Sequence, residues 1–353
     1  MAKKGFFDRP KDEVIAEMKR VHFPYIGNDN FEHFEKLHDL GFLPIVVKSV
    51  DEGTLLPVGL PFLTIRNTLP EFEWLPNYLE TLISTDLWKQ LTVATIAREY
   101  RKLSNAFGLE TNGNIDGTEW QNHDFSCRGQ SGLESSAING VAFLLSSCGT
   151  DNISALWAAE KFYNSRVDGD QLLAGSVAAG EHSVTTLGIL VEQERAKNDG
   201  EDIDVVEAEY RYKRWLLTER FPTGIVSDVS DSFDYWGHIT KNLPRLKDVI
   251  MARDGKYVVR GDSGNPVHII AGYRILEIDD DTSVKMLMEI VAKESRKLNG
   301  AEVILYKGQY HKILRTDFGG TIQITEAEAK GTIVILSEIF GYTVNELGYK
   351  NLD

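Results

Sequence analysis

LLAGSVAAGEHSVTTLGILVEQERAK, residues 172–197, contains in one stretch the pattern that decides the fold. Its first residues, 172–177, favour a short strand, and apolar residues at helical spacing over 183–197 indicate an amphipathic helix. Small and polar residues, among them Gly180 and His182, separate the two. A short buried strand that leads into a helix is typical of parallel α/β proteins, in which ligands bind at the carboxyl ends of the strands.

The same alternation continues on both sides of this stretch, so the sequence predicts an α/β fold with a parallel, (β/α) barrel-like body. Asp151 is a residue type that often caps the start of a helix, and we expect it to do so here. The further predicted elements are strands at 223–227 and 257–261, and helices at 132–146, 151–163, 205–220 and 243–252.

The two ends of the chain have a different pattern. Near the start, two short β-branched runs precede a long helical pattern, and near the end Lys307-Gly308 lies between two apolar runs, as in a hairpin. We expect a mixed α/β subdomain at residues 1–110 and the barrel-like body at 111–353. The predicted elements are strands at 43–50, 62–67, 302–306 and 310–315, and helices at 75–103 and 326–340.

Composition excludes several classes of function. The 353 residues include 53 acidic and 38 basic side chains, a net charge of -15, which disfavours long-range attraction to nucleic acid or an anionic membrane. Two cysteines, Cys127 and Cys148, are too few for a disulfide framework. The start has no signal-peptide pattern, and no run approaches the ~18 apolar residues of a membrane helix. We expect a cytoplasmic protein without nucleic-acid or membrane partners.

Four segments concentrate Gly, Asp, His, Ser and Arg where predicted strands end. A lone histidine such as His182 is more often structural, and Asp, Ser, Gly, Asn and Pro are all common in turns. Several such segments at successive strand ends are harder to dismiss, because a barrel site draws single residues from many strands. The segments are HDFSCRG (123–129), SVAAGEHSVT (176–185), SDVSDSFD (227–234) and RGDSGNP (260–266).

Together these segments resemble nicotinamide phosphoribosyltransferases in content and order. The likeness extends to GTD at 149–151 and, upstream, to LPIVVKSVDEGTLLPVG at 43–59 and TVATIAREYRK at 92–102. It covers nearly all of the chain and weakens after about Pro266. The resemblance implies an enzyme of NAD biosynthesis that transfers the phosphoribosyl group of phosphoribosyl pyrophosphate to nicotinamide and releases pyrophosphate.

The resemblance also implies which residues bind nicotinamide. Phe125 would stack on the pyridine ring. Asp151 would accept a hydrogen bond from the amide NH₂, and its charge would repel the carboxylate of nicotinic acid. Ser227 and the backbone at Val177 and Ala179 would line the same pocket.

Charged residues would bind the other substrate. Arg128 and Arg260 would hold phosphate oxygens and Asp262 the ribose hydroxyls, while Mg²⁺, for which the sequence indicates no ligands, would neutralise the pyrophosphate. In the family a histidine that matches His182 is phosphorylated by ATP. We expect Asp231 to orient the second ring nitrogen of that histidine.

Compared with the family, we expect the chain to lack a first and a last segment, so that the barrel-like body is incomplete. The family forms homodimers with active sites at the subunit interface, and we expect a homodimer here. Three alternatives stay open. A nicotinate-type phosphoribosyltransferase is disfavoured by Asp151, and a barrel-type glycoside hydrolase has no distinctive carboxylate pair in its support. A non-catalytic homologue or fragment that acts as a dimer partner is the third.

Overall fold

The computed structural model describes residues 3–165, 173–278, 300–314 and 320–352. The chain divides into two compact units: unit 1 is Met1–Leu109 with Asn114–Gly175, and unit 2 is Glu110–Gly113 with Ser176–Asp353. Hydrogen bonds from Asn345 Nδ2 to the Thr111 carbonyl (2.6 Å) and from the Tyr349 hydroxyl to Glu110 (3.1 Å) connect the short stretch to the rest of unit 2. The predicted domain division at residue 110 stays a prediction.

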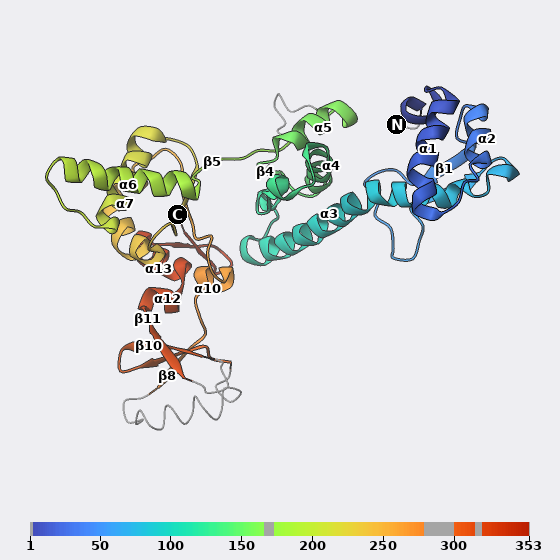
Figure 1. Ribbon diagram of the computed structural model, residues 1–353. Coiled ribbons are helices and arrows are strands. Elements are labelled where there is room, and N and C mark those ends of the chain that lie inside the picture. The colour runs from blue at the N-terminus through green and yellow to red at the C-terminus, as the bar shows by residue number, and fades with distance from the viewer. Residues whose placement is uncertain (1–2, 166–172, 279–299, 315–319, 353) are drawn as a thin grey trace. The chain divides into compact units, whose positions relative to one another are not determined.

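Unit 1 is mainly helical, and Figure 1 shows its longest helix, α3, as one unbroken rod. Its helices are α1 (Lys11–Ile26), α2 (Glu32–Leu40), α3 (Leu75–Asn112, of which the last three residues belong to unit 2), α4 (Leu133–Leu144) and α5 (Ile153–Tyr163), with short helical turns at Lys3–Phe7, Pro70–Phe72, Thr118–Trp120 and Ser126–Gly129. Its strands are β1 (Ile45–Ser49), β2 (Leu63–Asn67), β3 (His123–Asp124) and β4 (Gly149–Thr150).

The strands of unit 1 form two pairs of opposite kind. The antiparallel β1 and β2 confirm the strands predicted at 43–50 and 62–67, and the parallel β3 and β4 align His123 with Gly149. The helix predicted at 75–103 is confirmed and extends to Asn112. In the described part of the chain, neither this helix nor any other is both long and apolar enough to cross a membrane.

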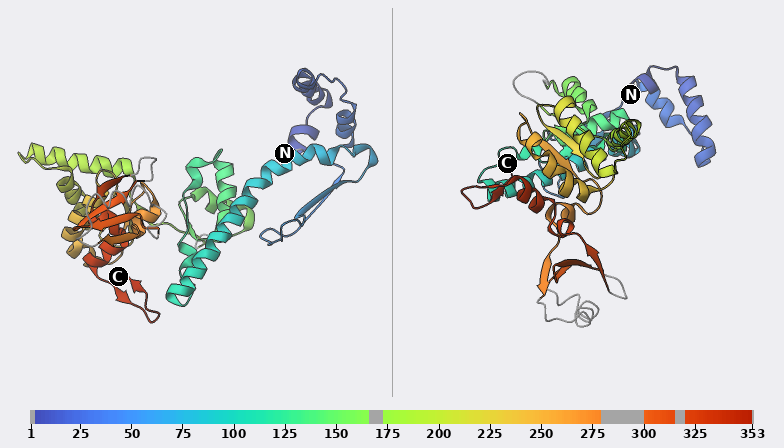
Figure 2. Two further views of the ribbon diagram at one scale, coloured as in Figure 1. Left: turned by 90° about the horizontal axis from the view of Figure 1, so that it is seen from below. Right: turned by 90° about the vertical axis from the view of Figure 1, so that its left-hand side faces the viewer.

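Unit 2 contains two sheets of more than two strands, with helices between and beside their strands (Figures 1 and 2). Its helices are α6 (His182–Asn198), α7 (Val205–Trp215), α8 (Tyr235–Gly237), α9 (Leu243–Met251), α10 (Pro266–Ala271), α12 (Glu326–Lys330) and α13 (Thr332–Phe340), with π-helical turns at Leu216–Arg220 and His238–Asn242. Its strands are β5 (Ala178–Ala179), β6 (Val226–Val229), β7 (Tyr257–Arg260), β8 (Ile275–Ile278), β9 (Val303–Tyr306), β10 (Gln309–Ile313), β11 (Thr321–Ile324), β12 (Thr343–Val344) and β13 (Lys350–Asn351).

The three-stranded sheet β5-β6-β7 is parallel throughout, as predicted, and aligns Ala179 with Ser227 and Val229 with Arg260. The strand predicted at 172–177 is wrong in its position, and Leu172 lies outside the described residues. Gly175 pairs with β4 of unit 1, whereas the strand of unit 2 begins at Ala178. Within the described part of the predicted run, only Gly175 pairs with a strand, and the parallel sheet of unit 2 begins one residue after the run ends.

The four-stranded sheet has the order β11-β10-β9-β8 and combines parallel with antiparallel pairs. The predicted hairpin is confirmed, because Tyr306 pairs with Gln309 across a turn in which Lys307 and Gly308 have φ of 49° and 75°. The mixture of helices with parallel and mixed sheets confirms the predicted α/β class. Among the described residues the strands form several open sheets and no closed barrel.

The single helix predicted at 326–340 is wrong, because Gly331 divides it into α12 and α13. Gly331 has φ of 81°, which ends the helical hydrogen-bond pattern. Its Cα is packed against the backbone of Gly272, so that a side chain at either position would collide with the other segment. The break lets both helices pack on one core cluster through Ala327 and Ile335.

Candidate functional site

The carboxyl ends of the parallel strands in unit 2 bring three predicted residues together. His182 opens α6 just after β5, Asp231 follows β6, and Asp262 follows β7. Because neighbouring parallel strands end at the same edge, these three side chains meet although 80 residues separate the first from the last.

His182 and Asp231 form a hydrogen-bonded pair in this group. His182 Nε2 lies 2.9 Å from Asp231 Oδ1, and the side chains are 38% and 6% exposed. The backbone N–H of Asp262 donates to the other oxygen of Asp231 (3.0 Å), and Asp262 Oδ2 lies 4.0 Å from His182 Nδ1. The carboxylate is thus fixed from two sides, whereas the imidazole keeps an exposed face.

The electrostatics of Asp231 favour its charged form. Burial alone would raise the pKa of this carboxyl, but hydrogen bonds from the Ser263 and His182 side chains and the Asp262 N–H outweigh burial and lower it. With Asp231 ionised, Nε2 of His182 must carry the hydrogen. The lone pair then resides on Nδ1, which is the nucleophilic atom of a neutral imidazole.

Arg260 is connected to the same edge through the backbone. Its Nη2 donates to the Gly180 carbonyl (3.1 Å), and Gly180 N–H donates to the Ser227 carbonyl (2.7 Å). Its Nε is buried and has no hydrogen-bond partner among the described residues, so the guanidinium retains capacity to bind an anion. Ser227 is half-buried on β6, and Val177 and Ala179 are exposed around β5.

A group of buried charges beneath this edge has no counterpart in the sequence predictions. Lys213 of α7 and Asp228 of β6 are both 0% exposed and form an ion pair. Lys213 Nζ also donates to the Val229 carbonyl (2.6 Å), and the Tyr257 hydroxyl donates to Asp228 (3.2 Å). These contacts join β6 to α7 and β7 immediately before Asp231, so they hold the strand end that carries the site.

Glu209 and His238 extend the buried group and are shifted towards their neutral forms. Burial raises the pKa of Glu209 to about 7, an effect that the neighbouring Lys213 opposes. Burial, and then Lys213, lower the pKa of His238 well below its ordinary value. At neutral pH the lysine is therefore balanced mainly by Asp228.

The three predicted residues of unit 1 lie around β3 and β4. Phe125 follows β3 and is 56% exposed, Arg128 is exposed on the turn after it, and Asp151 follows β4. His123, to which the sequence analysis assigned no role, contacts two of them. Its Nε2 lies 2.8 Å from Asp151 Oδ1, and its ring lies 4.6 Å from the Phe125 ring at an interplanar angle of 33°.

The prediction that Asp151 caps α5 is wrong. The cap position is Asn152, and the carboxylate of Asp151 instead accepts from His123. Buried Asn152 donates to the Ser136 carbonyl (2.9 Å) and to Asp124 (3.4 Å), and thereby connects β3, α4 and α5. The side-chain amide of Asn152 is hydrogen-bonded within the core, whereas the side chain of Asp151 lies at the surface of the unit.

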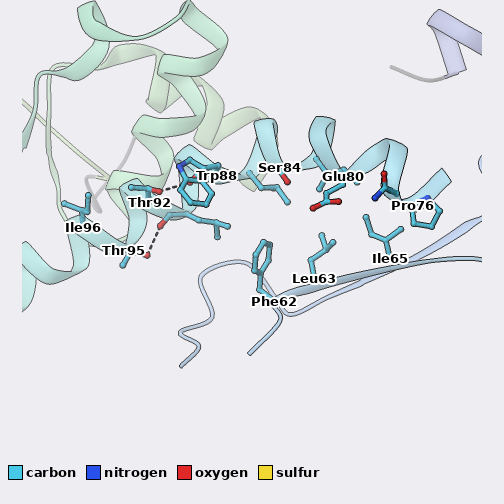
Figure 3. Close-up of a pocket in the computed structure, with 14 residues that line it drawn as sticks. Phe62, Leu63, Ile65, Pro76, Glu80, Ser84, Trp88, Thr92, Thr95 and Ile96 are labelled. Atoms are coloured by element: carbon cyan, nitrogen blue, oxygen red, sulfur yellow. Dashed lines mark hydrogen bonds between the residues drawn. The ribbon is translucent and has the colours of Figure 1, made fainter. Parts of the chain in front are cut away.

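An apolar pocket of about 860 Å³ lies elsewhere in unit 1, between β2 and α3. Figure 3 shows Phe62, Leu63 and Ile65 on one side and Trp88 on the other. No residue predicted for the site lines this pocket, so we do not connect it with the polar chemistry. In the parts of the chain that are described, no cluster of three His, Cys, Asp or Glu side chains is arranged to hold a metal ion.

The chain is similar to a known family and to several known proteins over much of its length. Residues 120–350 match the nicotinate phosphoribosyltransferase (NAPRTase) family. The chain is 36% identical over 340 residues to a nicotinamide phosphoribosyltransferase of Acinetobacter baylyi, covering 92% of this chain and 61% of that protein. Relatives with the same name from Xanthomonas campestris pv. campestris and Mycoplasma pneumoniae are 34% and 31% identical, over 65% and 74% of this chain and 45% and 50% of theirs. The chain thus spans less than two thirds of the length of these relatives.

Proposed function

The chain belongs to the nicotinate phosphoribosyltransferase family, and from this premise we propose that it transfers the phosphoribosyl group of phosphoribosyl pyrophosphate to nicotinamide. The products would be nicotinamide mononucleotide and pyrophosphate. The observation that carries the proposal is the meeting of His182, Asp231 and Asp262 at one edge of the parallel sheet. A site of this family needs polar groups at that edge, where α/β folds bind ligands.

In the transfer, the pyridine nitrogen would form a bond to C1 of the ribose as the bond from C1 to the pyrophosphate oxygen breaks. Negative charge develops on the leaving pyrophosphate, so that positioned cations lower the barrier. Arg260 would bind these oxygens through guanidinium N–H groups other than the buried Nε, since the Gly180 carbonyl already orients Nη2. Arg128 of unit 1 would bind further phosphate oxygens.

We assign the ribose hydroxyls to Asp262, whose side chain is 61% exposed. A carboxylate at this position is also an oxygen ligand of the type that Mg²⁺ prefers. When bound to pyrophosphate, Mg²⁺ would supply neutralising charge. Ser227, Val177 and Ala179, on and beside β5 and β6, are the nicotinamide contacts that we propose for unit 2.

In unit 1, we assign recognition of the ring to Phe125 and of the amide to Asp151. An ionised carboxylate accepts hydrogen bonds but cannot donate them, so Asp151 suits the NH₂ of nicotinamide and repels the carboxylate of nicotinic acid. This argument favours nicotinamide over nicotinate as the substrate.

ATP stimulation would act through His182. The lone pair of Nδ1 would attack the γ-phosphorus of ATP, and the bond from that phosphorus to the β,γ-bridging oxygen would break, which releases ADP. Nε2 keeps its hydrogen bond to Asp231, and the buried carboxylate stabilises the ring as its charge changes. Nδ1 is therefore the nitrogen that we expect to carry the phosphoryl group.

The test is a product assay on the full chain with nicotinamide, phosphoribosyl pyrophosphate and Mg²⁺, with and without ATP. His182→Ala should abolish ATP stimulation and retain most of the basal transfer. As a matched control, His268→Ala removes another histidine that pairs with a carboxylate, Glu302 (3.1 Å), and should keep both activities. Equal loss of basal and stimulated rates in His182→Ala would contradict the phosphohistidine role.

Two outcomes would contradict the wider proposal. A folded chain that neither forms the mononucleotide nor binds nicotinamide by calorimetry would support a non-catalytic partner role. We also propose a homodimer, and sedimentation that detects only monomer at micromolar concentration would contradict it.

A further inference from the structure

We propose that His123 is a positioning residue that orients Asp151 for the amide of nicotinamide and supports the Phe125 ring; this rests on the proposed function of those two residues. His123 opens the HDFSCRG motif, but the sequence analysis assigned it no role. It contacts both proposed binding residues, through a hydrogen bond to Asp151 (2.8 Å) and ring packing against Phe125 (4.6 Å between centroids).

The backbone makes this double contact possible. In the parallel pair β3–β4, His123 is aligned with Gly149, and Asp151 follows β4 directly. A Cβ on Gly149 would lie 2.7 Å from Nδ1 of His123, so the imidazole occupies space that only glycine leaves open. The Asp151 N–H donates to the carbonyl of Asp124, the residue between His123 and Phe125 (3.0 Å). This bond fixes the backbone of Asp151 against the segment that carries the two rings.

The chemistry of the pair suits recognition of an amide. Ionised Asp151 can only accept, so Nε2 of His123 donates. A carboxylate has about four acceptor sites, and it can accept from the histidine and from a ligand NH₂ together. A donor held against one oxygen restricts rotation of the carboxylate and so reduces the entropy lost when the amide binds.

The ring contact adds a second constraint. Phe125 is 56% exposed, and without a neighbour its side chain would be free to change rotamer. Because the imidazole packs on one face of Phe125, the pyridine ring is expected on the other face. His123 thus fixes the relative placement of an aromatic surface for the pyridine ring and an acceptor for the amide of nicotinamide.

Two variants separate the hydrogen bond from the ring. His123→Phe keeps an aromatic ring beside Phe125 but removes the donor, and His123→Gln keeps an N–H donor but removes the ring. Calorimetry on the full chain with nicotinamide and with nicotinic acid measures both affinities. We expect His123→Phe to weaken nicotinamide binding about tenfold, as for the loss of one charge-assisted hydrogen bond, and to narrow its preference over nicotinic acid. His123→Gln should retain more of the preference.

Asp151→Asn and the double variant His123→Phe/Asp151→Asn separate this inference from the proposed function. If His123 acts through Asp151, the double variant should bind nicotinamide no more weakly than Asp151→Asn alone. An unchanged preference in Asp151→Asn would overturn the proposed role of Asp151. A relaxed preference in Asp151→Asn together with parental binding in His123→Phe, or strictly additive losses in the double variant, would overturn the role of His123 and leave that of Asp151 standing.

Discussion

The pairs His123–Asp151 of unit 1 and His182–Asp231 of unit 2 have nearly the same hydrogen bond but opposite burial. In unit 1 the distance is 2.8 Å and the carboxylate of Asp151, 39% exposed, is more accessible than His123, at 25%. In unit 2 the distance is 2.9 Å, and His182 is 38% exposed whereas Asp231 is only 6% exposed. A ligand meets the more exposed member first. The same two residue types therefore suit amide recognition in unit 1 and nucleophilic chemistry in unit 2.

The buried residues that hold the strand ends below each pair also differ, since they are mostly uncharged donors in unit 1 and an ion pair in unit 2. In unit 1 the strand ends rest on Asp124, Asn152 and Ser136, where the carboxylate is bound by amide and backbone donors. In unit 2 the strand that carries Asp231 rests on the ion pair of Lys213 with Asp228. The proposed phosphorylation would change the charge of His182 above a strand that is held by buried charges, and these buried charges tie the stability of unit 2 to the protonation of its core.

The largest expected effect is on this ion pair. Lys213→Met leaves Asp228 as an unpaired buried charge and should lower the free energy of unfolding by about 3–5 kcal/mol, measured by urea denaturation. The double variant Lys213→Met/Asp228→Leu removes both charges and should recover much of that loss. Lys102→Met, which breaks an exposed pair with Glu99 on α3 of unit 1, should leave the free energy of unfolding nearly unchanged, because solvent screens this pair. If Lys213→Met lowered the free energy of unfolding as little as Lys102→Met does, the buried ion pair would not support unit 2 as we infer.

A second effect, of about 3 kcal/mol, should appear in the pH dependence of stability. Burial raises the pKa of Glu209 from 4.5 to about 7, so between these values the folded state binds more protons than the unfolded state. The stabilisation is complete below pH 4.5 and is lost as pH rises to about 7. The lowered pKa of His238 makes its contribution to stability increase with pH, opposite to that of Glu209. The effect of Glu209 is therefore measured as the difference between the parent and a Glu209 variant.

The measurement for Glu209 is urea denaturation of the parent and of Glu209→Gln over this pH range. Relative to the parent, the variant should become more stable as pH rises through the window. Exposed Glu99, whose pKa is lowered by the Lys102 hydrogen bond, titrates below the window, and Glu99→Gln should leave the slope unchanged. Parallel stability curves for the parent and Glu209→Gln would show that the buried carboxyl does not titrate there.

What could be predicted from the sequence was local pattern combined with one rule of topology. The resemblance implied the pairing of His182 with Asp231, and the rule that parallel strands end at a common edge agrees with it, although the strand before His182 was predicted at the wrong residues. His123 was missed because its partner is set by the register of β3 against β4, which a two-residue strand does not encode. Lys213 was missed because a lysine in an amphipathic helix is typical of a solvated face, and only packing against β6 shows that it is buried.

The smallest expected effect tests the opposite burial of the two carboxylates directly. Asp231→Asn should lower the free energy of unfolding by about 1–3 kcal/mol, because a buried amide cannot accept from every donor that now converges on the carboxylate. Asp151→Asn, at a 39% exposed position, should lower it by less than about 1 kcal/mol.

The pKa of Asp231 is lowered by its hydrogen bonds, so the stabilisation from its ionised carboxylate is present above the ordinary value of 3.8 and is lost as pH falls through the folded-state pKa. The difference between the two variants should therefore narrow in acid and be full at neutral pH. Urea denaturation measures both variants. Equal losses of the free energy of unfolding for Asp231→Asn and Asp151→Asn at pH 7 would mean that burial does not distinguish the two pairs. The assignment of the Asp151 carboxylate to recognition and of the His182 imidazole to phosphorylation would then lose its structural basis.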